Sequence, residues 1–190
     1  MKKILYLMRH GETMFNVQHR IQGWCDSPLT KNGIQQAIAA GEYFKNQSIV
    51  FDHAYCSTSE RCSDTLEYVT DLPYTRLKGL KEMFYGELEG ESERLNCLTP
   101  KECETYYLQF GGESSNTVRD RMLETLTAIM EKEDHHSVLA VSHSGACFNF
   151  LRAIQDPMKE LQKGFGNGTI FVYEFTDHQF YLKEVIRQYH

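Results

Sequence analysis

The hydrophobic pattern of the chain begins with a short, unbroken apolar run over residues 4–8, bounded by Lys3 and Arg9. A run of this length predicts a strand buried on both faces, because an amphipathic helix would space its apolar positions three and four residues apart. Further strands are predicted over residues 52–56, 74–78 and 137–142, with a hairpin over 169–175 and 180–186. The hairpin predicts an antiparallel edge on a mainly parallel sheet.

Helical spacing of apolar residues follows several of these strands. One helix is predicted after Thr30 as N-cap, with Ile34, Ala37, Ile38, Gly41 and Phe44 on one face. A second follows Ser57-Thr58-Ser59, a third follows Asn116 as N-cap, and a fourth follows residues 143–145. Strands alternating with helices predict an α/β fold in one domain, residues 1–190. Residues 13–27 are expected to be an ordered loop, and residues 83–115 a helical flap inserted between core elements.

Composition and charge narrow the class of protein. The net charge of −6 and the pI near 5.7 argue against nucleic acid or an anionic membrane as partner, because both favour a basic surface. No apolar run is long enough to span a membrane, and the first apolar run ends at Arg9 without a signal-peptide cleavage site. The six cysteines contain no C-x-x-C pair. We therefore expect a cytoplasmic protein with reduced, structural cysteines and no zinc site.

Candidate chemistry lies where two buried strands end. Arg9 and His10 follow the first strand, and His143 follows the strand over residues 137–142. Ligands of open α/β sheets bind beyond the carboxyl ends of the strands, so the two histidines are expected to share one crevice. The other histidines have no comparable placement, and no special role is predicted for His19, His53, His135, His136, His178 or His190.

The residues around His10 also resemble a known family. Arg9-His10-Gly11-Glu12-Thr13, then Asn16, the run Gly-Trp-Cys-Asp-Ser-Pro-Leu-Thr over residues 23–30, and Gly33 with Gln36-Ala37 resemble the opening of the histidine phosphatase (phosphoglycerate mutase-like) superfamily. The resemblance implies a three-layer α/β/α sandwich with a mainly parallel mixed sheet. It also implies that His10 is the residue that becomes phosphorylated.

Two later motifs extend the resemblance. Ser57, Arg61 and Thr65 match the Ser-x-x-x-Arg-x-x-x-Thr pattern that carries the family's second phosphate-binding arginine. Residues 80–90 resemble the Leu-x-Glu-x-x-x-Gly-x-x-Glu-Gly pattern, whose first glutamate, here Glu82, is the general acid of the family's phosphatases. The chain departs from the family at Leu88, where many members carry tryptophan, and at Ser144-Gly145, where the usual form is Gly-Gly or Gly followed by another residue.

These residues suit phosphoryl transfer. A phosphate monoester dianion repels nucleophiles, so cations must hold its oxygens while a nucleophile is placed in line with the leaving oxygen. His10 is the predicted nucleophile, and Glu82, with a raised pKa, is the predicted general acid and base. The predicted substrate-binding residues are Arg9, Asn16, Gln22, Gly23, Arg61, His143 and Ser144.

Three functions are open at this point. A phosphomonoester hydrolase acting on a small phosphorylated metabolite is favoured, because all five catalytic candidates are present and the flap carries seven glutamates against Arg94 and Lys101. A phosphoglycerate mutase would use the same site but needs more cations over its pocket, and a non-catalytic phosphoester-binding module would need neither His10 nor Glu82. No metal or other cofactor is expected. The sequence specifies neither the particular monoester nor the oligomeric state.

Overall fold

A six-stranded mixed sheet forms the centre of the computed structural model, which describes residues 2–187. The strands are β1 (Lys3–Arg9), β2 (His53–Ser57), β3 (Tyr74–Leu77), β4 (Ser137–Ser142), β5 (Ile170–Thr176) and β6 (Gln179–Ile186), in the order β3-β2-β4-β1-β5-β6. β1 to β4 are parallel, whereas β5 runs antiparallel to both β1 and β6. Each predicted strand is confirmed within one or two residues of its expected bounds.

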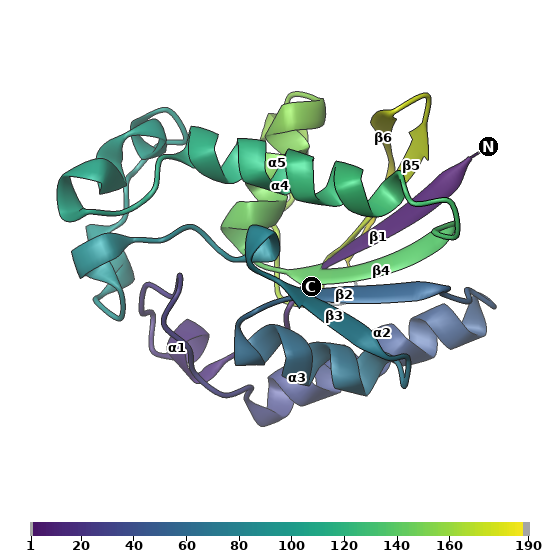
Figure 1. Cartoon of the computed structure of the whole chain (residues 1–190). Coiled ribbons are helices and arrows are strands. Elements are labelled where there is room, and N and C mark those ends of the chain that lie inside the picture. The colour runs from purple at the N-terminus through teal and green to yellow at the C-terminus, as the bar shows by residue number, and fades with distance from the viewer. Residues whose placement is uncertain (1, 188–190) are drawn as a thin grey trace.

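Helices cover both faces of the sheet (Figure 1). α2 (Lys31–Asn46) and α3 (Glu60–Val69) lie on one face, and α4 (Ser115–Met130) and α5 (Ser144–Ile154) lie on the other. Along β4, Val138 and Ala140 belong to the apolar cluster under α4 and α5, whereas Leu139 and Val141 belong to the cluster under α2 and α3. Successive side chains of a strand face opposite sides, so a strand covered on both faces has consecutive apolar residues, as β4 has over residues 138–141. The predicted three-layer α/β/α fold is confirmed.

Of the two N-caps predicted from the sequence, one is confirmed and one is wrong. Thr30 caps α2, its hydroxyl accepting a hydrogen bond from the Gly33 amide at 3.0 Å. The predicted cap of α4 at Asn116 is wrong, because Ser114 accepts from the Thr117 amide at 3.0 Å and the helix begins at Ser115. Two one-turn helices were not predicted, α1 (Met14–Val17) inside the expected loop and α6 (Met158–Leu161) after α5.

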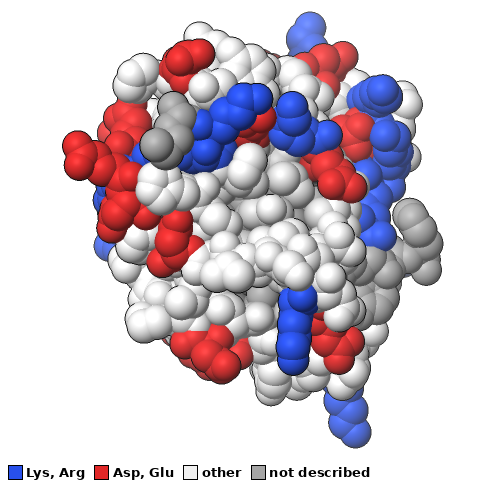
Figure 2. Space-filling view, turned by 90° about the vertical axis from the view of Figure 1, so that its right-hand side faces the viewer, with Lys and Arg blue, Asp and Glu red and all other residues white. Residues whose placement is uncertain are grey.

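The amino ends of the parallel strands lie opposite the end that carries His10. Figure 2 shows this side, where charged side chains of both signs lie mainly around the rim. Here Asp134 joins two histidines, since His53 Nε2 lies 3.0 Å and His135 Nδ1 lies 2.8 Å from its two carboxylate oxygens. The three residues offer possible metal ligands within 4.8 Å of one another. The Tyr55 hydroxyl lies 2.6 Å from His135 Nε2, so both nitrogens of this ring are paired inside the protein.

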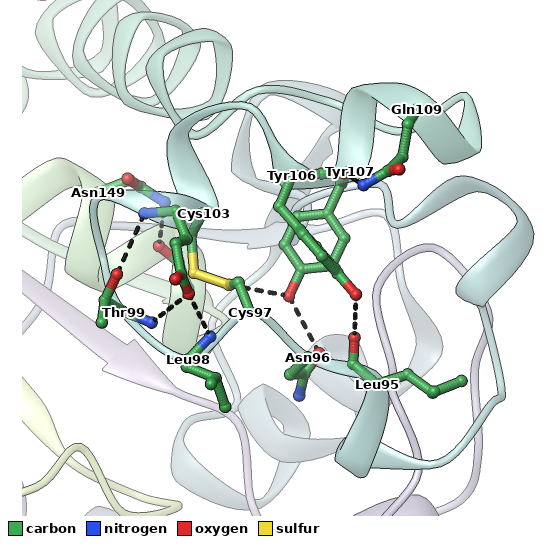
Figure 3. The surroundings of a disulfide bond; sticks show 12 residues. Leu95, Asn96, Cys97, Leu98, Thr99, Cys103, Tyr106, Tyr107, Gln109 and Asn149 are labelled. Atoms are coloured by element: carbon green, nitrogen blue, oxygen red, sulfur yellow. Dashed lines mark hydrogen bonds between the residues drawn. A yellow bond between two sulfur atoms is a disulfide. The ribbon is translucent and has the colours of Figure 1, made fainter.

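The flap is built from short 3-10 turns, and no α-helix occurs between residues 83 and 114. η2 (Gly86–Leu88), η3 (Glu93–Leu95), η4 (Glu102–Glu104) and η5 (Tyr106–Phe110) follow η1 (Lys78–Leu80), which precedes the flap. The flap packs on itself through polar contacts (Figure 3), among them the Tyr106 hydroxyl to Leu95 O and the Tyr107 hydroxyl to Asn96 Oδ1, both at 3.0 Å.

The expectation that all six cysteines are reduced is wrong for one pair. Cys97 and Cys103 form a disulfide inside the flap, with their Cα atoms 5.5 Å apart (Figure 3). The flap's own turns bring the two residues to bonding distance, and nothing in the sequence pattern marks this pairing. Cys25, Cys56, Cys62 and Cys147 are free. Burial raises the pKa of the Cys56 thiol to about 12, which makes it a weak nucleophile and fits the predicted structural role.

No helix within residues 2–187 is long and apolar enough to cross a membrane.

Candidate active site

His10 is held in a defined tautomer at the end of β1. Its Nδ1 lies 2.7 Å from the Gly11 carbonyl oxygen, which can only accept, so Nδ1 carries the proton. Nε2 is therefore the unprotonated nitrogen, and its lone pair accepts a hydrogen bond from Arg61 Nε at 3.3 Å. The side chain is buried. The lone pair needed for nucleophilic attack is thus on one known nitrogen.

The surroundings of His10 keep its ring neutral. Burial is the main cause that lowers the pKa of His10 well below its ordinary value, and the nearby charges of Arg61 and Arg9 lower it further. The hydrogen bond to the Gly11 carbonyl works in the opposite direction and is outweighed. A neutral imidazole at neutral pH is the form that attacks phosphorus.

Arg61, from the first turn of α3, is completely buried and uses all five of its N–H groups. Nε donates to His10, NH1 to Cys25 O at 3.0 Å and Asp26 Oδ1 at 2.9 Å, and NH2 to Gly23 O and His143 Nδ1, both at 2.8 Å. A phosphoryl oxygen can bind this guanidinium only by displacing one of those acceptors. In this structure Arg61 orients both histidines and anchors the loop at residues 22–26.

His143 follows β4, as expected, and its ring centre lies 5.3 Å from that of His10. Because Arg61 donates to its Nδ1, Nε2 carries the proton, and this N–H donates to Ser57 Oγ at 2.8 Å. Burial, followed by the charge of Arg61, lowers the pKa of His143 well below the ordinary value. The ring is therefore neutral, and both nitrogens are paired within the site.

Arg9 and Asn16 present donors to the space in front of His10. Arg9 donates from NH1 to the Phe165 carbonyl oxygen, and its buried Nε has no hydrogen-bond partner. Asn16 uses its Oδ1 to accept from the Thr13 amide and from Asn167 Nδ2, both at 3.1 Å. This leaves the Asn16 amide nitrogen to donate. A bound anion would satisfy donors of this kind.

Glu82 is buried although it lies in a charged stretch. Its carboxylate accepts from the Met83 amide and, at the start of α5, from the Gly145 amide, both at 2.8 Å. Burial raises the pKa of Glu82, and the two amides and Arg61 only partly oppose this. A carboxyl with a raised pKa can hold a proton for a leaving group.

Gly145 explains the Ser-Gly sequence after His143. A Cβ atom at this position would lie 2.6 Å from Glu82 Oε1, so any side chain would push the carboxylate away. Glycine is thus needed at position 145, whereas Ser144 is tolerated and lines the site. The departure from the family pattern falls at the position with room for a side chain.

A cavity of about 530 Å³ connects these groups. It is lined by six of the predicted site residues, namely Arg9, His10, Asn16, Gln22, Glu82 and Ser144. The remaining three predicted residues are buried and do not line the cavity. Arg61 and His143 contact one another, and the Gly23 carbonyl oxygen accepts from Arg61. The structure therefore gathers every predicted site residue, but in two layers.

Sequence reasoning missed several residues that hold this site. Asn167 Nδ2 donates to the His10 carbonyl oxygen at 3.1 Å, Asp26 pairs with Arg61, and Glu89 accepts from the amides of residues 23–25. Asp26 and Glu89 lie within the motifs that carry the family resemblance, and this was the available signal. Nothing in the sequence around Asn167 marks it.

We expect turnover to be unaffected by a chelator. Arginines and N–H donors supply the positive potential at this site, and among residues 2–187 the three-residue group with metal-ligand geometry lies at the other end of the sheet. Initial rates should be measured with and without EDTA after prolonged incubation. Loss of activity in EDTA that Mg²⁺ or Zn²⁺ restores would contradict this expectation.

Comparison with known proteins agrees with this geometry. The family model described as histidine phosphatase superfamily (branch 1) matches residues 5–187. A 2,3-bisphosphoglycerate-dependent phosphoglycerate mutase of Bacteroides fragilis is 42% identical over 96 residues, which cover 47% of this chain and 38% of the mutase. The aligned part thus spans well under half of that relative.

Solved structures match over nearly the whole chain. Bacillus stearothermophilus YhfR has a TM-score of 0.82 at 29% identity, covering 95% of both chains. A phosphoserine phosphatase mutant of Entamoeba histolytica, in complex with phosphoserine, has a TM-score of 0.80 at 26% identity, covering 96% of both. The chain belongs to the histidine phosphatase superfamily, branch 1.

Proposed function

We propose that the protein is a phosphomonoester hydrolase that acts on a small phosphorylated metabolite through a phosphohistidine at His10. The observation that carries this proposal is the pairing of two groups on one cavity, the unprotonated Nε2 of His10 and the carboxyl of Glu82 with its raised pKa. One is a nucleophile and the other a proton donor, which are the two groups that cleavage of a phosphate ester needs.

The proposed reaction has two displacements. His10 Nε2 attacks phosphorus, the ester P–O bond breaks, and the leaving oxygen takes the proton of Glu82 to depart as an alcohol. The Glu82 carboxylate then takes a proton from water, whose oxygen attacks the phosphohistidine. The N–P bond breaks, inorganic phosphate leaves, and His10 and Glu82 return to their starting protonation states. Arg9 and Asn16 stabilise the charge on the phosphoryl oxygens.

The mutase alternative is supported by the match to phosphoglycerate mutases. The flap's seven glutamates are weaker evidence against it than the sequence indicates. Glu89 accepts from backbone amides and Glu113 pairs with Arg121, so neither acts freely on the cavity. The cavity lining itself is more informative. Within residues 2–187, the cationic side chains of this lining are Arg9 and Arg20, and the acidic ones are Glu82 and Glu93. A mutase holds a carboxylate and two phosphoryl groups in turn, which calls for more positive charge than this.

We therefore expect negligible isomerisation of 3-phosphoglycerate in the presence of catalytic 2,3-bisphosphoglycerate. The protein should first be screened for phosphate release from a panel of phosphorylated metabolites, to identify its best monoester. Isomerisation at ordinary enzymatic turnover, roughly 10 s⁻¹ or more, would overturn the hydrolase proposal. Release of phosphate from none of the panel, with tight binding of one member, would instead support a non-catalytic phosphoester-binding module.

A further inference from the structure

A second cavity of about 250 Å³ continues from the first. The two share lining residues, among them Tyr85, Gly145 and Phe148. Gly145 is also the residue whose amide holds the Glu82 carboxylate. Since Gly145 lines both cavities and holds the Glu82 carboxylate, we place the leaving oxygen that Glu82 protonates near the junction of the two cavities. The part of the substrate beyond that oxygen is directed toward the second cavity.

The lining of this second cavity is uncharged. Its walls are apolar and aromatic, with Met83, Leu98, Pro100, Phe148 and Leu161 among the lining residues, and no Asp, Glu, Lys or Arg lines it in the described part of the chain. The first cavity, in contrast, contains two arginines and two glutamates. A wall of this kind favours a neutral, apolar leaving group, because a charge buried there would have no partner.

Two residues of this apolar lining each carry a buried polar atom that lacks a partner. Ser115 Oγ, at the start of α4, and Asn149 Oδ1, on α5, are buried without a hydrogen bond. The Asn149 amide is oriented, since its Nδ2 donates to the Gly145 carbonyl oxygen at 2.9 Å, which leaves Oδ1 as an acceptor. Figure 3 shows the Asn149 side chain beside the Cys97–Cys103 loop, which forms another wall of the cavity.

We propose that the second cavity is a leaving-group subsite for a neutral aromatic or heteroaromatic group that bears an N–H or O–H donor. Asn149 Oδ1 accepts from that donor, and Ser115 Oγ serves as the second polar contact. Buried polar groups in proteins are almost always paired, so two unpaired ones in one cavity wall mark where a ligand supplies the partners. This inference rests on the proposed hydrolase activity and names its substrate class.

The test compares monoesters of primary alcohols, so that the demand for protonation of the leaving oxygen is similar. The probes are 2-(indol-3-yl)ethyl phosphate, its N-methylindole analogue, ethyl phosphate and O-phosphoserine. For the natural protein, kcat/KM is expected to be at least about 100-fold higher for the indole ester than for ethyl phosphate or O-phosphoserine. N-methylation, which removes the donor, is expected to lower kcat/KM at least about tenfold.

Variants then assign the preference to Asn149. Asn149→Leu is expected to bring the ratio of kcat/KM for the N–H and N-methyl esters close to one. The matched control, Asn46→Leu, replaces an exposed asparagine of α2 outside both cavities and should keep the ratio unchanged. If Asn149→Leu does not fold, the subsite is still tested by two measurements. One is the comparison of the four esters with the natural protein, and the other is Ser115→Ala, which should also lower the preference for the N–H ester.

The outcomes separate the two proposals. Hydrolysis of all four esters with similar kcat/KM overturns the subsite and leaves the hydrolase proposal standing. Equal values for the N–H and N-methyl esters overturn the role of Asn149. No hydrolysis of these esters or of p-nitrophenyl phosphate overturns the hydrolase proposal and, with it, the subsite.

Discussion

His10→Ala is expected to lose phosphatase turnover by at least roughly 10⁴-fold while keeping the fold. The reason is that His10 lines the cavity and its Nε2 is unprotonated, with a hydrogen bond from Arg61 Nε at 3.3 Å, whereas His143 does not line the cavity and its unprotonated Nδ1 accepts from Arg61 NH2 at 2.8 Å. Within residues 2–187, no second imidazole lines this cavity to replace the nucleophile. Initial rates with p-nitrophenyl phosphate measure the loss, and circular dichroism and the Tm check the fold.

The matched control is His136→Ala, which removes an exposed histidine at the opposite end of the sheet. Its turnover should equal that of the natural protein. A phosphoenzyme trapped by acid-free quenching should be stable in alkali and labile in acid, as an N–P bond requires, and the label should lie on the peptide that contains residue 10. Label on serine or cysteine, or activity retained by His10→Ala, would contradict the assignment of the nucleophile.

The fold could be predicted from the sequence because burial on both faces leaves a simple pattern. β1 and β4 each contain an unbroken apolar run, over residues 4–8 and 138–141, and each strand is followed directly by the histidine that the site uses. The residue that ends a buried apolar run in the sequence also lies at the edge of the sheet, so its position in the fold can be predicted from the local sequence. His10 and His143 were thus predictable as a pair, even though 132 residues separate them in the chain.

The surroundings of Glu82 could not be predicted in the same way. It lies between Lys81 and Met83 in a stretch without regular secondary structure, where the local pattern indicates an exposed residue. Its burial comes from distant contacts, the Gly145 amide on its carboxylate and Trp24 Nε1 on its backbone oxygen. Only the family motif marks this residue, because a pattern of neighbours carries no information about such contacts.

The flap and Arg61 show two further limits. The flap's turns lack the period of a helix or strand, so its disulfide and its contribution to both cavities follow from tertiary structure alone. Arg61 was correctly placed beside His10, but its complete pairing with Cys25, Asp26 and other groups depends on how the loop at residues 22–26 closes over it. Sequence patterns can predict which residues lie close together. They are poorer at predicting which hydrogen-bonding groups of those residues remain unpaired.

Glu82→Gln is expected to lower kcat/KM for 2-phenylethyl phosphate by roughly 10²- to 10⁴-fold and for p-nitrophenyl phosphate by less than about tenfold. An alkoxide is a poor leaving group and must be protonated as it departs, whereas p-nitrophenolate departs without a proton. Both esters carry an aromatic ring, so their difference reports the demand for protonation. The parameter kcat/KM is chosen because it reflects steps up to release of the alcohol, before the phosphohistidine is hydrolysed.

The pH dependence supplies the second readout. Since burial raises the pKa of Glu82, the carboxyl stays protonated to higher pH than an ordinary glutamate. For the alkyl ester, kcat/KM of the natural protein should therefore fall as the pH rises through this raised pKa, because the ionised form has no proton to donate. Glutamine does not titrate, so the low kcat/KM of Glu82→Gln should lack this fall, while the ionisation of the ester affects both proteins alike. Equal losses for the two esters, or a fall with pH that persists in the variant, would mean that Glu82 is not the proton donor.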